Sequence, residues 1–287
     1  MAEPTAPTKS RAGRDLPMAI LVGVGLFAAI ALTLAYWHWG FVLLAAAAFC
    51  LGAVEVYRAL QRIHMFAAIV PIVIGTAAIM IGSYMASQIE HPKIASNNFL
   101  LVALGLTVLV SLAWRMPKGP DGFVRDAAAS LFIIGYIPLL ASFIPLLLAP
   151  ADGPRRIIAV VMCVVASDTG GYVVGVLAGK HPMAPVISPK KTWEGFGGSV
   201  LFGVVVGALA VHYLLGGSWV VGLLLGAAIV ASATLGDLVE SLIKRDVGIK
   251  DMSNFLPGHG GVMDRLDSIL VSAPVGWLVL YHFVPTV

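Results

Sequence analysis

The sequence predicts an all-α integral membrane protein, a polytopic bundle of about nine transmembrane helices with a cytoplasmic N-terminus. Of its 287 residues, 59% are hydrophobic and 11% are charged, whereas ordinary globular proteins carry about 25% charged residues. Apolar runs recur along the chain, and several reach the roughly 20 residues that a membrane-crossing helix needs. A soluble enzyme, a disordered chain and a nucleic-acid-binding protein are therefore poor fits, and no nucleic acid is expected as a partner.

The apolar runs between charged residues divide into nine expected crossings. Asp168 is the single charge in its run, and Gly216-Gly217-Ser218 supplies a turn that splits a run of 42 uncharged residues into two helices. The expected crossings are residues 17–37, 39–54, 65–89, 94–114, 127–151, 157–179, two within 195–236, and 268–283.

Basic residues set the expected orientation, because short loops rich in Lys and Arg stay in the cytoplasm. With a cytoplasmic N-terminus, 15 of the 18 Lys and Arg residues fall inside, and only Lys93, Arg155 and Arg156 fall outside. Pro138 and Pro145 could divide the fifth run into a two-helix hairpin, but that would leave 10 basic residues inside against 8 outside. We therefore expect one kinked crossing, in which neighbouring helices or Ser and Thr side chains satisfy the freed backbone groups.

These crossings organise the chain into a tail and two halves. Residues 1–16 are polar and lack periodicity, so we expect a disordered cytoplasmic tail. Residues 17–151 hold the first five helices, and residues 152–287 hold the last four together with two cytoplasmic loops, at 180–194 and 238–267. No soluble domain fits in these loops, so the chemistry must reside in the helices or in the two long loops.

Charge is concentrated from Asp237 to Asp267, where 31 residues carry 10 of the chain's 33 charges. Asp237, Glu240 and Lys244 recur at spacings of three and four, which places them on one face of a helix that continues out of the eighth crossing. Asp264 and Asp267 repeat this spacing at the start of the ninth. Carboxylates at two facing helix ends suit a divalent cation such as Mg²⁺, especially one that bridges to phosphates.

The alternative interpretation is a solvated loop whose charges only mark the cytoplasmic face. It is disfavoured because Asp237 follows 42 uncharged residues and Asp267 precedes 20, so both acids lie at helix ends near the membrane surface. Burial there without a partner or a metal would be costly. The glycines of the intervening loop would let its backbone approach a phosphate closely.

A second cluster extends from Asp168 to Glu194. An ionisable group at membrane depth is a functional candidate by default, although Asp168 could instead pack between helices beside an amide or hydroxyl. The sequence Asp168-Thr169-Gly170-Gly171 also allows a helix break that turns the carboxylate into a polar cavity. The run Ser188-Pro189-Lys190-Lys191-Thr192-Trp193-Glu194-Gly195 sets two lysines beside hydroxyl donors, which suits a polyphosphate as well as a positive membrane anchor.

The segment from Ser241 to Asp267 resembles the signature of the phosphatidate cytidylyltransferases, also called CDP-diacylglycerol synthases. That signature reads S-x-x-K-R-x-x-x-x-K-D-x-x-x-x-x-[PG]-x-H-G-G-x-x-D-R-x-D. The matching positions are Ser241, Lys244, Arg245, Lys250, Asp251, Pro257, His259, Gly260, Gly261, Asp264, Arg265 and Asp267. The run after Ser188, preceded by Asp168-Thr169, is similar to a second region shared by that family.

The resemblance implies that CTP and phosphatidate react to give CDP-diacylglycerol and pyrophosphate with the help of Mg²⁺. We assign this cation to Asp237 and Asp264, with Asp267 either as an additional ligand or as a residue that supports the two ligands; a second cation is left open. The expected catalytic residues are Lys244, Arg245, Lys250, Asp251, His259, Arg265 and Asp267. The expected substrate-binding residues are Asp168, Ser188, Lys190, Lys191, Thr192, Glu194, Gly260 and Gly261.

Two other functions stay open, a CTP-dependent lipid kinase and an ion-coupled transporter. The long signature favours cytidylyl transfer over a kinase, and the gathering of charge in cytoplasmic segments favours an enzyme over a transporter. The expected setting is the plasma (inner) membrane, among membrane lipids, with the active site facing the cytoplasm. The resemblance further implies a homodimer.

Overall fold

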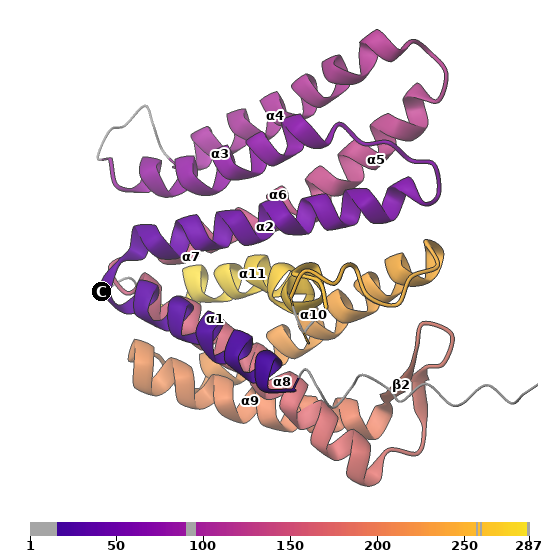
Figure 1. Cartoon of the computed structure of the whole chain (residues 1–287). Coiled ribbons are helices and arrows are strands. Elements are labelled where there is room, and N and C mark those ends of the chain that lie inside the picture. Colours follow the sequence, from indigo (N-terminus) through magenta and orange to yellow (C-terminus); the bar gives the residue numbers. More distant parts are fainter. Residues whose placement is uncertain (1–15, 90–95, 257, 259, 286–287) are drawn as a thin grey trace, which may run out of the picture.

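The computed structural model describes residues 16–89, 96–256, 258 and 260–285. Most of this part of the chain is helical (Figure 1). The helices are α1 (Leu16–Tyr36), α2 (His38–Gln61), α3 (Ile69–Ser87), α4 (Ser96–Arg115), the 3₁₀ helix η2 (Met116–Lys118), α5 (Phe123–Tyr136), α6 (Pro138–Ala141), α7 (Phe143–Leu148), α8 (Gly153–Ala178), α9 (Trp193–Leu215), α10 (Trp219–Asp246) and α11 (Met263–Phe283). The predicted tail lies outside the described residues except for Leu16, where α1 begins.

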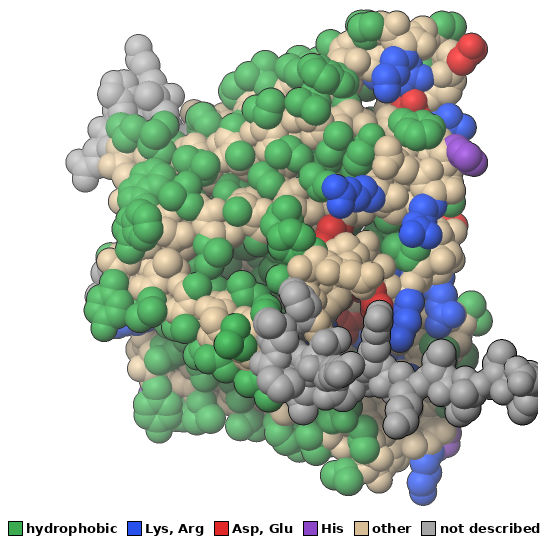
Figure 2. All heavy atoms as spheres, in the orientation of Figure 1, with side chains coloured by type: hydrophobic (Ala, Val, Ile, Leu, Met, Phe, Trp, Pro, Cys, Tyr) green, Lys and Arg blue, Asp and Glu red, His purple; other side chains and the backbone are tan. Residues whose placement is uncertain are grey.

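The surface of the bundle is that of a membrane protein. Eight helical segments in the described ranges are long and apolar enough to cross a bilayer, and the apolar helix α1 accompanies them. Large apolar side chains point outward, including Phe27 (74% exposed) and Leu101 (70% exposed). Figure 2 shows this apolar surface over the body of the molecule, with Lys and Arg side chains gathered along one edge. Soluble proteins rarely expose so large an apolar area, so the prediction of a polytopic all-α membrane protein is confirmed.

The fifth crossing is one interrupted helix, as predicted. Residues Phe123–Leu148 form a single span in which Pro138 begins α6 and Pro145 lies within α7. Proline lacks the N–H that continues helical hydrogen bonding. At the α6–α7 junction the Ser142 hydroxyl donates to the carbonyl oxygen of Leu139 at 2.6 Å, so a side chain contributes hydrogen bonding where the helix is interrupted.

Glycines bring α8, α9 and α10 into close contact. A Cβ atom on Gly170 of α8 would lie 2.5 Å from the carbonyl oxygen of Gly198 in α9. Likewise, a Cβ on Gly207 of α9 would lie 2.5 Å from the carbonyl oxygen of Gly222 in α10. Small residues at membrane helix interfaces let backbones approach in this way, and here they fix the three helices on which much of the site is built.

The structure corrects three boundaries. Helix α8 continues through Gly170 and Gly171, so the alternative of a helix break after Asp168 is wrong; the packing of Gly170 against α9 accounts for a glycine there. The segment expected as a loop at 180–194 contains an antiparallel hairpin, β1 (Pro182–Ala184) and β2 (Ser188–Thr192), and α9 begins at Trp193. The loop expected at 238–267 spans only residues 247–262, since α10 continues to Asp246, as the spacing of Asp237, Glu240 and Lys244 predicted, and α11 begins at Met263.

Helices α10 and α11 cross at the edge of the site. A Cβ atom on Gly236 would lie 2.6 Å from the carbonyl oxygen of Asp267 and 3.1 Å from the Cα atom of Ser268. About one helical turn away, Ser232 Oγ donates to Ser272 Oγ at 3.1 Å. This crossing brings the residue after Gly236, Asp237, next to the start of α11.

Candidate active site

The β1–β2 hairpin and the end of α10 face each other across an open cavity of about 690 Å³. They touch where Arg245 Nε donates to the carbonyl oxygen of Ile187 at 3.2 Å. The lining includes Ser188, Pro189 and Lys190 of the hairpin and Ser241, Lys244, Arg245 and Lys250 of the other segment. The structure therefore joins the two charged clusters that the sequence separates by about 50 residues.

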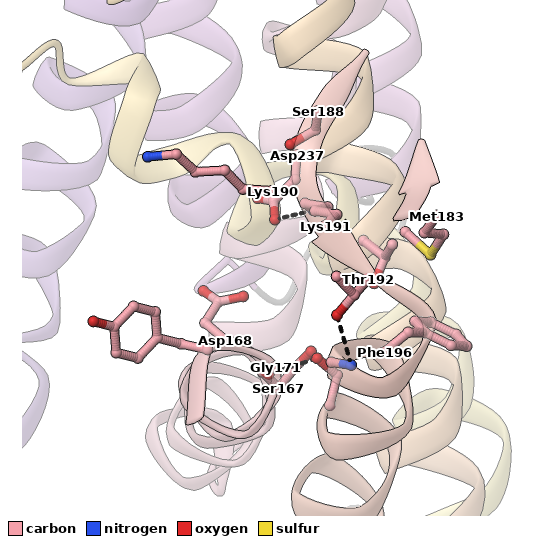
Figure 3. A pocket seen from close by; sticks show the side chains of 14 residues that line it. Ser167, Asp168, Gly171, Met183, Ser188, Lys190, Lys191, Thr192, Phe196 and Asp237 are labelled. Atoms are coloured by element: carbon pink, nitrogen blue, oxygen red, sulfur yellow. Dashed lines mark hydrogen bonds and ion pairs between the residues drawn. The ribbon is translucent and has the colours of Figure 1, made fainter. Parts of the chain in front are cut away.

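A smaller cavity, of about 350 Å³, shares Ser188 and Lys190 with the first. Figure 3 shows the Asp168 carboxylate pointing from α8 into this cavity, on the same side as Lys191 and Asp237. Asp168 thus lines a polar cavity, which is one of the alternatives that the sequence left open. The helix that carries it is unbroken.

The Asp237 carboxylate joins the hairpin to both helices of the crossing. Its Oδ2 atom accepts a hydrogen bond from Lys191 Nζ at 2.5 Å, and its Oδ1 atom accepts one from Ser268 Oγ at 2.6 Å. The Asp237 side chain is 30% exposed and lines the smaller cavity. It can therefore be reached by a substrate that enters this cavity.

Lys244 lies between two carboxylates of the adjoining acidic cluster, which consists of Asp237, Glu240, Asp264 and Asp267. Its Nζ atom donates to Glu240 on the same helix and to Asp264 Oδ1 on α11, the latter at 2.9 Å. Asp267 is buried and interacts electrostatically with Asp237 and Glu240. Four carboxylates thus share the α10–α11 junction, with Lys244 between Glu240 and Asp264 and with Lys191 at Asp237.

The acidic cluster has the chemistry of a Mg²⁺ site without forming a complete one. Mg²⁺ prefers oxygen ligands and usually binds one or two carboxylates together with substrate phosphates. The Glu240 Oε1 atom is buried and has no hydrogen-bond partner in the described part of the chain, so the cluster has unsatisfied acceptor capacity. Nowhere in the described part of the chain are three or more His, Cys, Asp or Glu side chains arranged to hold a metal ion by themselves. The residues fit a cation that obtains part of its coordination from a substrate.

Asp264 also organises the loop before α11. Its Oδ2 atom accepts hydrogen bonds from the backbone N–H groups of Met252 at 2.9 Å and Gly261 at 2.8 Å. A Cβ atom on Gly261 would lie 2.8 Å from this same Oδ2, which explains a glycine at that position. The predicted metal ligand is therefore held by contacts on both sides of the loop.

Within this loop, Leu256 and Gly260 exchange two backbone hydrogen bonds. Gly258 and Gly260 have φ angles of 75° and 82°, in the region that glycine occupies readily. Neither Gly260 nor Gly261 lines the two cavities, so the structure does not bring these predicted phosphate-binding glycines to the cavity walls. The predicted catalytic residue His259 lies outside the described residues.

Thr192 and Glu194 organise the start of α9. The Thr192 hydroxyl lines the smaller cavity and accepts a hydrogen bond from the Gly195 N–H at 3.1 Å. Glu194 Oε2 accepts hydrogen bonds from the N–H groups of Lys180 and His181 at 3.0 and 3.1 Å, and its Oε1 lies 2.5 Å from His181 Nδ1. Glu194 lies outside the lining of both cavities. Its contacts instead hold the residues that follow α8 against the first turn of α9.

The other predicted residues lie just after α10 and in the first turn of α11. Lys250 and Asp251 line a further groove of about 450 Å³ together with Arg58 of α2 and Arg62, which directly follows that helix. Arg265 is exposed in the first turn of α11.

Sequence reasoning missed Glu55 of α2. Its carboxylate is buried and contacts the loop before α11. The sequence does single Glu55 out, because it is the one acidic residue between positions 16 and 89. A charge buried in so apolar a stretch must find polar partners.

Acids and lysines around cavities at one edge of a helical membrane bundle indicate a membrane-embedded enzyme. The chain belongs to the cytidylyltransferase family, which it matches over residues 17–283. It is 41% identical over 286 residues to the phosphatidate cytidylyltransferase of Mycobacterium leprae, covering 94% of this chain and 89% of that protein. The protein of the same name from Mycobacterium bovis is 39% identical over 288 residues, with 96% and 91% covered. That from Haemophilus influenzae is 38% identical over 192 residues, with 63% and 66% covered.

Proposed function

We propose that this protein transfers the cytidylyl group of CTP to phosphatidate, giving CDP-diacylglycerol and pyrophosphate for phospholipid synthesis. The observation that carries the proposal is the larger cavity, where Lys190 of the hairpin and Lys244, Arg245 and Lys250 of the opposite wall surround one space. Walls with this charge suit two phosphate-bearing substrates. The relatives that align over nearly the whole chain carry the name of this activity.

In the proposed reaction, a phosphate oxygen of phosphatidate attacks the α-phosphorus of CTP. A bond forms between these two atoms, the bond from the α-phosphorus to the oxygen that bridges to the β-phosphorus breaks, and pyrophosphate leaves with the electron pair. The attacking phosphate is already ionised at neutral pH, so no general base is needed. Because both substrates are anions, positioning and charge neutralisation supply most of the catalysis.

The basic residues divide between the two substrates. Lys190 and Thr192 approach CTP from the hairpin, beside Asp168 and Ser188 in the smaller cavity. On the opposite wall, Lys244, Arg245 and Lys250 hold the triphosphate or the lipid phosphate. Arg265, in the first turn of α11 and outside the lining of this cavity, is proposed to act with them. Support for this division comes from the facing arrangement of the two segments across the larger cavity.

Mg²⁺ would be held by Asp237 and Asp264, with Asp267 either as an additional ligand or as a residue that supports the two ligands. When bound, it would neutralise negative charge on the phosphate oxygens of CTP. Lys191 and Lys244, which contact Asp237 and Asp264, place positive charge at the same carboxylates. Support for the site comes from the all-carboxylate donor set and the unpartnered Glu240 Oε1 atom nearby.

The proposed setting is the plasma (inner) membrane, with both cavities open to the cytoplasm. Support comes from the 15-to-3 distribution of basic residues and from the Lys and Arg side chains along one edge in Figure 2. A homodimer is the proposed assembly, on the family resemblance alone.

Two competing functions make different predictions. A CTP-dependent lipid kinase would transfer the γ-phosphate and release CDP, whereas cytidylyl transfer releases pyrophosphate. A transporter would distribute acids along a path through the bilayer, whereas the acidic cluster lies at the junction of α10 and α11 next to the connecting loop.

A turnover assay on the purified protein tests the proposal. With CTP, phosphatidate and Mg²⁺ in mixed micelles, we expect CDP-diacylglycerol and pyrophosphate in equal amounts, no turnover with excess EDTA, and recovery when Mg²⁺ is restored. Release of CDP without CDP-diacylglycerol would contradict the reaction, and full turnover in EDTA would contradict the metal requirement.

A further inference from the structure

Glu55 connects the N-terminal half of the protein to the loop before α11. Its side chain extends from α2 and is 4% exposed. One carboxylate oxygen, Oε1, accepts hydrogen bonds from Ser253 Oγ at 2.5 Å and from the Val262 N–H at 3.0 Å. The other, Oε2, accepts one from the Met263 N–H at 2.8 Å.

These contacts satisfy the N-terminus of α11. The first N–H groups of a helix have no partner within the helix, and a carboxylate there is favourable as a hydrogen-bond acceptor and as a negative charge at the positive end of the helix dipole. Asp264 binds the N–H groups of Met252 and Gly261, and Glu55 binds the next two along the chain. The start of α11 is thus held between two carboxylates, one from its own first turn and one from α2.

The fit around Glu55 is tight. A Cβ atom on Gly261 would lie 2.9 Å from Glu55 Oε2, so a larger residue there would displace the carboxylate. Met263, next to Gly52 of α2, is fully buried. In the described part of the chain Glu55 has no Lys, Arg or His within ion-pair distance, so hydrogen bonds to the loop compensate its burial.

We infer that Glu55 is a positioning residue for the proposed cytidylyl transfer. By fixing the start of α11, it sets the positions of Asp264 and Asp267 relative to α10. Glu55 lines neither of the two cavities, so it acts through the loop and not on a substrate. The inference rests on the proposed function and gives the N-terminal half a part in it.

The test is the steady-state kinetics of Glu55→Gln in the full-length protein. Glutamine keeps the size of the side chain but places an NH₂ group against an N–H or O–H donor, which leaves a buried donor unsatisfied. We expect kcat to fall about 10- to 100-fold while the KM values for CTP and phosphatidate stay within about threefold of wild type. Ser253→Ala, which removes one of the three donors, should lower kcat about two- to fivefold, and in the double variant it should add no further loss.

The matched control is Asp152→Asn. Asp152 is also buried, and it binds Arg156, which donates to the carbonyl oxygens of Leu280 and Val284 at the far end of α11. We expect this variant to lower the melting temperature and to leave kcat per folded enzyme unchanged.

Three results would overturn the inference while the wild type remains active. The first is a wild-type kcat in folded Glu55→Gln. The second is a loss of kcat in Asp152→Asn as large as that in Glu55→Gln, when both variants lose the same melting temperature. The third, which applies if Glu55→Gln does not fold, is a wild-type kcat in Ser253→Ala. An inactive wild-type protein would instead contradict the proposed function.

Discussion

Lysine–carboxylate pairs define the candidate site at the residue scale. Lys191 binds Asp237, and Lys244 binds Asp264 together with Glu240. Removing one partner of such a pair leaves the other charge uncompensated, and the penalty grows with burial. Substitutions should therefore preserve shape where the aim is to test chemistry.

Asp264→Asn is the most direct test of the proposed metal ligand. The amide oxygen can still accept hydrogen bonds from the N–H groups of Met252 and Gly261, so the loop should persist, while the negative charge is lost. We expect no measurable turnover, with unchanged expression and elution in detergent. Asp246→Asn, at an exposed acid at the end of α10, should behave as wild type. Activity of Asp264→Asn within about tenfold of wild type, or about 1.4 kcal/mol in the barrier, would refute the assignment.

Lys190→Ala tests the division of substrates between the two walls. Loss of a contact made equally in the ground and transition states raises KM and leaves kcat nearly intact. A hydrogen bond to a charged group is worth about 1.5–3 kcal/mol, so the KM for CTP should rise about 10- to 150-fold. Lys180, which is exposed and lines neither cavity, provides the control variant, Lys180→Ala. A rise in the phosphatidate KM alone would reverse the roles of the two walls.

The sequence predicts which residues have the right chemistry better than it predicts their contacts. Asp168 shares a cavity with Lys191 and Asp237, because an ionisable group in the middle of an apolar helix needs a polar environment. Glu194 has equally suitable chemistry, yet it binds the segment after α8. Glu55 was missed because its partners come from residues about 200 positions away, and no local pattern encodes such a contact.

At the element scale, close helix crossings hold the site together. The α10–α11 crossing at Gly236 places Asp237 beside Ser268, and the α8–α9 contact at Gly170 and Gly198 places Asp168 near the hairpin. Because the atoms in contact are backbone atoms, a side chain at these glycines can be accommodated only by moving a helix.

Gly236→Ala tests this role of the crossing. The added Cβ would meet the Asp267 carbonyl oxygen at 2.6 Å, so α10 and α11 must separate at a cost of about 1–3 kcal/mol. We expect a lower melting temperature and a large loss of turnover. Gly105→Ala in α4, where nothing lies within 4 Å of an added Cβ, should change neither. A Gly236→Ala enzyme with wild-type stability and turnover would show that the crossing does not set the geometry of the site.

Helices were more predictable than the connections between them. Apolar length and bounding charges predicted each crossing, including the interrupted one at Pro138, since the bilayer imposes that length. The β1–β2 hairpin was not predicted because its strands are short, of three and five residues, and show no alternation of apolar and polar residues. Helix α8 continues past Gly170 and Gly171 because packing against α9 outweighs the low helix propensity of glycine.

At the scale of the whole molecule, the proposed function requires the two cavities to face the side that supplies CTP. The hairpin and the α10–α11 loop should therefore be cytoplasmic and the α7–α8 turn outside. The family match over residues 17–283 extends into the N-terminal half, where the Glu55 contacts give a physical reason for both halves to act together.

Cysteine labelling in intact cells tests this orientation. In a variant with Cys50 and Cys163 replaced, single cysteines at Ala151 and Asn254, both exposed, report the two sides. An impermeant thiol reagent should label position 151 in intact cells and position 254 only after permeabilisation. Labelling of position 254 alone in intact cells would invert the proposed topology.

The central claim is that the cytidylyl group, and not the γ-phosphate, reaches the lipid. The most direct test uses purified protein with phosphatidate and CTP labelled either at the α- or at the γ-phosphorus, followed by thin-layer separation of the lipids. We expect lipid-bound label from α-labelled CTP only, in a product that migrates as CDP-diacylglycerol, with the γ-label recovered in pyrophosphate. Lipid-bound label from γ-labelled CTP would identify a lipid kinase and contradict the account.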